Sequence, residues 1–190
     1  MHRHDVKLES YCVLKDALSH LDTPDWSLVI VGDGVAHQTV RDMYAEFGDR
    51  ISFTGKLDRP EIDIRYREAD IFVWPGVNEA FGMVYLEAQL AGLPVVAENR
   101  PGVREVIGVS ESLIEQGNPA RFADAIRTLL NSEELRQNRG QKGYEFVVEN
   151  HLRDTASGTL AEQIGFYTQL TVPENAKKQS GLGQNPGGGN

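Results

Sequence analysis

Several features that mark particular classes of protein are scarce in this chain of 190 residues. It holds one cysteine, Cys12, which excludes a disulfide framework within the chain and a metal site built from several cysteines. Positive charge is also scarce, because 19 Lys and Arg are set against 28 Asp and Glu, and the net charge is −9. This balance argues against a protein that binds nucleic acid or an anionic membrane surface in general.

Long hydrophobic runs are missing as well. The longest have the length of a strand, for example residues 93–97, whereas a segment that spans a bilayer needs about 20 apolar residues. The start of the chain has no apolar core of a signal peptide, so we expect a cytoplasmic protein. The five histidines show no metal-ligand spacing, and no G-x-S-x-G elbow or other nucleophile and base set stands out.

The chain does have the composition of a soluble globular protein, with 40% hydrophobic and 25% charged residues. Its hydrophobic pattern alternates between helical and strand periods, which indicates an α/β fold with a mainly parallel sheet. The predicted strands are 27–31, 51–53, 71–74 and 94–97, and the predicted helices are 8–21, 39–47, 60–68, 81–90, 118–130, 132–148 and 152–170.

The composition changes at the end of the chain. Residues 181–190 include five glycines and Pro186, and such a segment cannot bury enough apolar surface to offset its backbone entropy. We therefore predict one domain over residues 1–170 and a disordered, glycine-rich tail over residues 171–190.

A glycine turn follows the first predicted strand. Gly32-Asp33-Gly34 would let a ligand phosphate approach the backbone at the start of a helix, although an ordinary tight turn explains it equally well. A dinucleotide fingerprint needs a third glycine at the position of His37, and an acidic residue where Phe53-Thr54-Gly55 stands. A nicotinamide-dependent dehydrogenase is therefore disfavoured.

Residues 74–87 are more informative, because a strand, a Pro-Gly loop with Glu79 and a helix that starts near Gly82 follow one another there. In open parallel sheets, ligands bind beyond the carboxyl ends of the strands. Free N–H groups and the helix dipole favour a phosphate at this place, and Glu87 would accept hydrogen bonds from a sugar diol. The N–H groups belong to Phe81, Gly82, Met83 and Val84. The plainer interpretation is that Glu79 is a charge at a helix start and that Glu87 faces solvent.

Two cations in this acidic chain, Arg3 and Lys7, lie four residues apart before the first predicted helix. In a loop, such a pair would hold two phosphates, and the plainer interpretation is surface charge near a terminus. The polar loop of residues 99–106 follows the fourth predicted strand, and it either closes over a ligand or simply connects two elements.

Taken together, residues from about 3 to 167 resemble the C-terminal, donor-binding domain of the retaining glycosyltransferases of family 4. These enzymes have the GT-B fold, in which two Rossmann-like domains face each other. Glu79, Phe81-Gly82 and Glu87 resemble the family's signature of two glutamates separated by seven residues. Four further matches stand in the order that the family has, at residues 28–34, 53–57, 69–75 and 90–97.

The resemblance implies an enzyme that transfers a hexose, with retention of configuration, from a UDP- or GDP-type nucleotide sugar to an unidentified acceptor. Glu79 would contact hydroxyls of the donor sugar, and Glu87 would bind the ribose. The backbone from Phe81 through Val84 would hold the diphosphate and the sugar.

The resemblance also implies roles for residues outside this stretch. Arg3 and Lys7 would neutralise the departing nucleoside diphosphate, Leu57 would face the base, and Gly32 would belong to the donor site. Neither a cofactor nor a metal is implied, since the cations and the helix start stabilise the developing charge. A nucleic-acid partner is not implied either.

The chain also departs from the family pattern. The loop after the fourth strand has one glycine, Gly102, where the family usually has a pair. The acceptor-binding domain and the first strand, which would precede Arg3, are missing from the sequence. We therefore expect one GT-B half-domain in a truncated chain, inactive or very weak by itself, with a sheet that is open at its centre.

Two further expectations follow from this truncation. Peripheral membrane contact would come only through the missing N-terminal domain. The alternative to a transferase is a noncatalytic module that binds a nucleotide, or a partner protein through the exposed strand edge.

Overall fold

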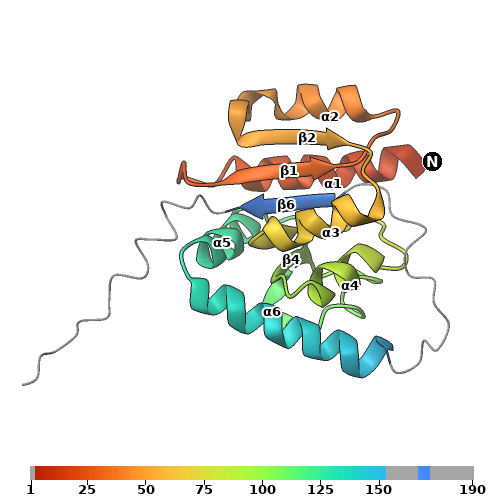
Figure 1. The fold of residues 1–190 in the computed structure, drawn as a ribbon. Coiled ribbons are helices and arrows are strands. Elements are labelled where there is room, and N and C mark those ends of the chain that lie inside the picture. The colour runs from red at the N-terminus through yellow and green to blue at the C-terminus, as the bar shows by residue number, and fades with distance from the viewer. Residues whose placement is uncertain (1–2, 153–166, 172–190) are drawn as a thin grey trace, which may run out of the picture.

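A computed structural model describes residues 3–152 and 167–171, with side chains from residue 7 to residue 151. Within these ranges the chain forms a six-stranded sheet in the order β2-β1-β6-β3-β4-β5 (Figure 1). The strands are β1 (Ser27–Val31), β2 (Ile51–Gly55), β3 (Ile71–Val73), β4 (Val95–Glu98), β5 (Leu113–Ile114) and β6 (Tyr167–Thr171). The pairs β1–β2, β3–β4 and β4–β5 are parallel, which confirms the predicted α/β class.

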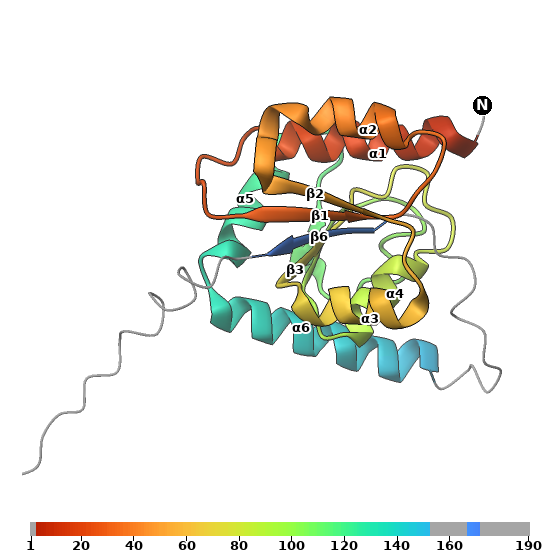
Figure 2. The same cartoon turned by 45° about the horizontal axis from the view of Figure 1, so that its top comes forward.

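Helices cover both faces of the sheet. Helices α1 and α2 lie on one side, and α3, α4 and α6 lie on the other (Figure 2). The α-helices are α1 (Arg3–Leu18), α2 (His37–Tyr44), α3 (Arg59–Glu68), α4 (Met83–Leu90), α5 (Pro119–Leu130) and α6 (Glu133–Val147). Shorter helical segments are η1 (Ala45–Arg50), η2 (Ser110–Ser112) and η3 (Val148–Leu152).

Local sequence signals account for several helix starts. Helix α3 has a capping box, in which the Asp58 carboxylate accepts from the N–H of Glu61 and the Glu61 carboxylate accepts from the N–H of Asp58. Asn118 caps α5 and Ser132 caps α6, each by accepting a backbone N–H three residues later. These caps explain why the predicted helices begin close to their observed positions.

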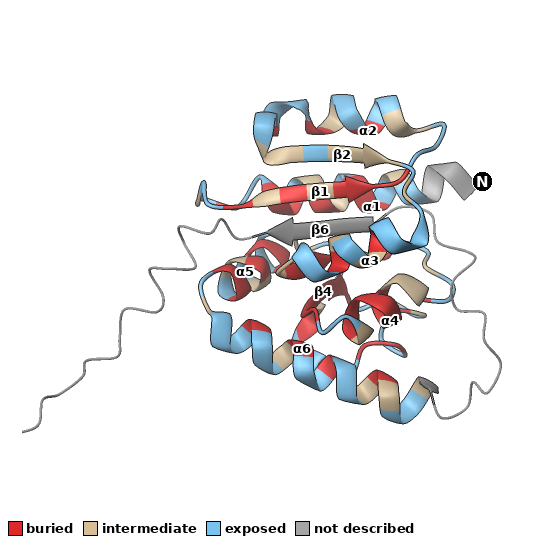
Figure 3. Cartoon of the chain, viewed as in Figure 1, coloured by how far each residue is buried: buried red, intermediate tan, exposed pale blue. Residues whose placement is uncertain are grey.

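The core lies between the sheet and the two helix layers (Figure 3). Strands β3 and β4 are buried along their whole length, as expected for parallel strands that are covered on both faces. Tyr11 of α1 packs edge-to-face against Trp74, with ring centroids 5.0 Å apart. This aromatic pair fixes α1 against the end of β3.

Strand β6 corrects two of our expectations. It runs antiparallel between β1 and β3 and pairs with both of them, so the sheet is not open at its centre. The helix predicted over 152–170 is therefore wrong at residues 167–170, while residues 153–166 lie outside the described ranges. The segment Tyr167-Thr168-Gln169-Leu170-Thr171 is rich in residues that favour strands, and it satisfies backbone groups of both neighbours.

The filled gap also removes the basis for partner binding through an exposed edge between β1 and β3. The predicted tail of residues 171–190 lies outside the described ranges, except that Thr171 ends β6. Strand β5, which the sequence pattern did not predict, has two residues and is too short to show a period.

Candidate functional site

The carboxyl ends of β1, β3 and β4 lead into loops at one edge of the sheet, because these strands are parallel to one another within the fold. The loop after β3 ends at Gly82, the N-cap of α4, which has a left-handed backbone with φ of 63°. Helix α4 thus begins at Met83, two residues later than predicted. A β-carbon on Gly82 would lie 2.4 Å from Cγ2 of Val106, so this turn is closely packed against the loop after β4.

Glu79 turns back onto the start of α4. Its Oε1 accepts hydrogen bonds from the backbone N–H groups of Phe81, at 3.4 Å, and Gly82, at 3.3 Å. The plainer interpretation of Glu79, a charge at a helix start, therefore describes the structure without a ligand. The same contacts show that these amides converge on one anionic oxygen. Met83 and Val84 occupy the first turn of α4, where N–H groups have no acceptor within the helix.

Glu87 does not face solvent, because its side chain is only 3% exposed. Its Oε1 accepts from Nη1 of Arg59 at 2.7 Å, and its Oε2 accepts from the hydroxyl of Tyr66 at 3.2 Å. Burial raises the pKa of the Glu87 carboxyl above its ordinary value, while Arg59 and Tyr66 oppose this rise. The predicted hydrogen bonds to a ribose stay a prediction, and they would have to coexist with these two contacts.

Arg3 and Lys7 lie in helix α1, not in a loop before it. Ser10, three residues after Lys7, accepts a hydrogen bond from the N–H of Val77 at 2.9 Å, which ties α1 to the loop that carries Glu79. Helix α1 therefore borders the site, and Lys7 on this helix is exposed.

The remaining predicted residues lie at the ends of β1 and β2. Gly32 follows β1 and donates its N–H to the carbonyl of Gly55 at 2.8 Å. Leu57 lies between β2 and α3 and is half-buried. Asp33 accepts from the N–H of Gly34 at 2.8 Å, a contact that supports a tight turn.

Sequence reasoning missed three functional candidates: Ser10, Arg59 and Glu98. Glu98 ends β4 with its side chain 1% exposed, and it accepts from Arg100 at 2.7 Å and from the N–H of Gly117 at 2.8 Å. A charged residue directly after an apolar strand run was the only available signal for Glu98. For Ser10 and Arg59 the sequence offers none, because their partners are 67 and 28 positions away.

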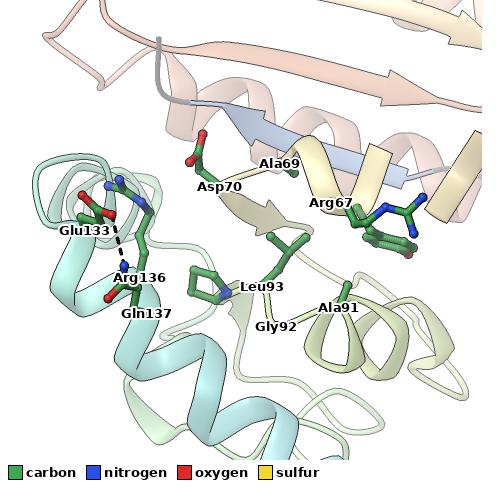
Figure 4. Close-up of a pocket in the computed structure, with 11 residues that line it drawn as sticks. Arg67, Ala69, Asp70, Ala91, Gly92, Leu93, Glu133, Arg136 and Gln137 are labelled. Atoms are coloured by element: carbon green, nitrogen blue, oxygen red, sulfur yellow. Dashed lines mark hydrogen bonds between the residues drawn. The ribbon is translucent and has the colours of Figure 1, made fainter. Parts of the chain in front are cut away.

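A cavity of about 330 Å³ lies elsewhere, at the amino ends of β3 and β4 (Figure 4). Asp70 and Pro94, which precede these strands, border it together with Arg136. The Arg136 guanidinium already donates to the carbonyls of Leu129 and Leu130 at the end of α5. Glu79 follows the carboxyl end of β3, so this cavity lies at the opposite end of the strands from the loop of Glu79.

Over residues 7–151, whose side chains the structure describes, no three His, Cys, Asp or Glu side chains gather as metal ligands would. None of the helices in the described ranges combines the length and the apolar character that crossing a membrane requires.

The fold places the chain among domains of GT-B glycosyltransferases. It matches the C-terminal domain of a group 1 glycosyltransferase from Francisella tularensis with a TM-score of 0.64 and 25% identity, covering 77% of this chain and 80% of that one. It also matches the catalytic domain of a cholesterol-alpha-glucosyltransferase from Helicobacter pylori, with a TM-score of 0.61, 20% identity and coverage of 76% and 91%.

The sequence narrows this class further. Residues 5–146 match the family model described as glycosyl transferases group 1, and the chain belongs to this family. It is 34% identical over 148 residues to a D-inositol 3-phosphate glycosyltransferase of Corynebacterium efficiens, covering 75% of this chain and 34% of the relative.

A second relative is a GDP-mannose-dependent alpha-(1-6)-phosphatidylinositol monomannoside mannosyltransferase of Mycobacterium tuberculosis. It is 33% identical over 147 residues, which are 72% of this chain and 38% of the relative. The chain thus spans little more than a third of the length of these curated relatives.

Proposed function

We propose that this chain is the donor-binding half of a retaining glycosyltransferase, which transfers a hexose from a UDP- or GDP-type nucleotide sugar. The observation that supports it best is the pair of N–H groups of Phe81 and Gly82, which converge on one carboxylate oxygen of Glu79. Both contacts are long for hydrogen bonds, so a phosphate oxygen can take the place of the carboxylate. Glu79 is then released toward the hydroxyls of the donor sugar.

The chemistry needs stabilisation of charge at the departing diphosphate. Donors that are already oriented lower the barrier most when they point at the place where charge develops. The first turn of α4 supplies such donors together with the positive end of its dipole, and Arg3 and Lys7 on α1 supply cations. We therefore propose that transfer proceeds without a metal, by same-face attack assisted by the leaving phosphate, and that Glu79 is no covalent nucleophile.

The choice between donors rests on relatives. The mycobacterial relative is named as GDP-mannose-dependent, which favours a GDP-type donor among the two classes. The acceptor and the cytoplasmic location belong to the same proposal, and the acceptor would be bound by a domain other than this one.

Binding measurements on the chain test the proposal. UDP, GDP and ADP are added in thermal-shift experiments, and saturation at 100 times the dissociation constant stabilises the folded chain by about 2.7 kcal/mol. Amide NMR resonances of residues 81–84 should move when the nucleotide binds. The proposal fails if neither UDP nor GDP binds, or if the resonances of these four residues stay in place.

A variant separates a transferase site from a simple nucleotide module. We expect a nucleotide sugar to bind the wild type more tightly than its nucleoside diphosphate does, and Glu79→Ala to abolish this difference while the diphosphate still binds. Glu46→Ala is the matched control, because Glu46 is exposed in an ion pair with Lys15 and lies in η1, before the amino end of β2. A difference that persists in Glu79→Ala argues against the role of Glu79.

A further inference from the structure

The contacts around Glu87 form a small network between helices α3 and α4. Arg59 is the first residue of α3, and its guanidinium donates through Nη1 to Glu87 at 2.7 Å and through Nε to Asp63 at 2.9 Å. The Arg59 side chain is 43% exposed, whereas that of Glu87 is 3% exposed. Arg59 therefore lies between a buried carboxylate and solvent.

The position of Arg59 is well defined by its neighbours. The capping box of Asp58 and Glu61 fixes the start of α3, and Asp63 holds the guanidinium from the next turn. Leu57, which is expected to face the base, precedes this cap by one residue. A single short stretch of chain thus carries both Leu57 and the cation that contacts Glu87.

We propose that Arg59 is the positioning residue of the ribose subsite: it holds Glu87 as a buried anion and thereby makes the chain prefer ribonucleotides. This inference rests on the proposed function, in which Glu87 accepts hydrogen bonds from the ribose. Arg59 is not catalytic, because it acts on the nucleotide through Glu87.

The hydrogen-bonding capacity of a carboxylate makes this arrangement possible. Its two oxygens offer about four lone-pair sites, and Arg59 and Tyr66 each take one site on a different oxygen. These two contacts leave one site on each oxygen untaken, and we assign those sites to the two hydroxyls of a ribose. The network therefore orients Glu87 without filling its capacity as an acceptor.

Charge explains why a cation is needed at this place. A carboxylate that is buried without a cation tends to take up a proton, and the protonated acid is a poorer acceptor for a diol. Burial already raises the pKa of Glu87, and Asp63 acts in the same direction. Arg59 and Tyr66 are the groups of α3 that oppose the protonation of Glu87.

A merely structural role would give a different result. If the ion pair only joined α3 to α4, its loss would lower the stability of the chain and would weaken the binding of every nucleotide by a similar factor. A positioning role instead changes the ratio between the affinities of a nucleotide with ribose hydroxyls and one without them.

The test compares GDP or UDP, whichever binds more tightly, with its 2′,3′-dideoxy analogue by calorimetry. We expect the wild type to prefer the ribonucleotide at least tenfold at pH 7, and Arg59→Gln to reduce this preference below threefold. Arg59→Lys should restore part of it. Arg65→Gln is the matched control, because Arg65 lies on the same helix in an exposed ion pair with Glu68.

The pH profile adds a second readout. As the pH falls, the preference of the wild type disappears when Glu87 takes up its proton, and in Arg59→Gln it disappears at a higher pH. If Arg59→Gln does not fold, Arg59→Met, which keeps much of the aliphatic stem, is measured in its place. The control Arg65→Gln should follow the wild-type profile.

The outcomes separate this inference from the proposed function. A wild type that binds neither ribonucleotide overturns both. A wild type that binds ribo- and dideoxynucleotides equally leaves the diphosphate site in place and overturns the ribose subsite with the role of Arg59. A preference that survives intact in the Arg59 variant overturns the role of Arg59 alone.

Discussion

Gly102 lies so close to Glu79 that a β-carbon on Gly102 would be 2.5 Å from the carbonyl oxygen of Glu79. Gly102 also has a left-handed backbone, with φ of 79°. The loop after β4 is thus pressed against the loop that carries Glu79, and a single glycine makes this approach possible. Gly102 therefore has a structural role at the site even though the paired glycines of the family are missing.

Gly102→Ala should destabilise the chain and disturb the site. The added β-carbon meets backbone, which cannot rotate away, in addition to the cost of the left-handed conformation. We expect a loss of about 1–3 kcal/mol beyond that of Gly92→Ala, which shares the left-handed backbone but has open space around it. Urea denaturation of both variants measures this, and equal losses would show that the contact with Glu79 is unimportant.

Ser10→Ala should weaken the attachment of α1 to the same loop. Ser10 is fully buried, and the alanine leaves the N–H of Val77 without the hydroxyl that it now contacts. The free energy of unfolding should fall by about 1–2 kcal/mol. Ser19→Ala, which removes an exposed hydroxyl bonded to the Lys15 carbonyl, should change it by less than about 0.5 kcal/mol.

Two truncations test the role of β6. A chain that ends at residue 166 lacks the strand, so β1 loses five register partners and β3 loses two. Each ladder hydrogen bond contributes about 1 kcal/mol net, and we expect the melting temperature to fall by more than about 5 °C. A chain that ends at Thr171 should melt like the full chain. Similar melting of both truncations would contradict the central position of β6.

Glu87→Gln should change how stability depends on pH. The pKa of Glu87 is raised in the folded chain, mainly by burial, so the folded state holds the proton more tightly than the unfolded state does. Wild-type stability is therefore lost as the pH rises from the ordinary carboxyl pKa through the raised one. The glutamine variant lacks this loss. The difference between its melting temperature and that of the wild type should therefore shift in favour of the variant as the pH rises from 4 to 7. A constant difference over this range would contradict the raised pKa.

Much of the fold could be predicted because several of its strands are short apolar runs, of which β3 and β4 are buried along their whole length. β1 was predicted at its observed residues, and β3 and β4 within one residue at each end, since continuous apolar runs bounded by glycine or proline are typical of covered parallel strands. The predicted helix over 152–170 is wrong at its end, because a helical spacing of apolar residues carries no information about an unfilled strand position between β1 and β3. Tertiary pairing overrides local periodicity in such a place.

The candidate site could likewise be predicted only in part. The order of strand, glycine loop and helix placed the amides of residues 81–84 at a helix start, because glycine and the helix period are local signals. The contacts of Glu87 with Arg59 and Tyr66 could not be predicted, since they depend on how α3 packs against α4. The same holds for Ser10 and Val77, whose contact depends on the position of α1.

By itself, the sequence determined the class of the fold, the family and the residues that form the turn before α4, because these depend on local composition and on short, ordered motifs. Only the tertiary structure decided that Glu79 rests on that turn, that Glu87 is a buried carboxyl group beside Arg59, and that β6 completes the sheet. Each of these needs two segments that are distant in the chain to meet, and the free energy of such a meeting comes from packing and from pairing buried polar groups.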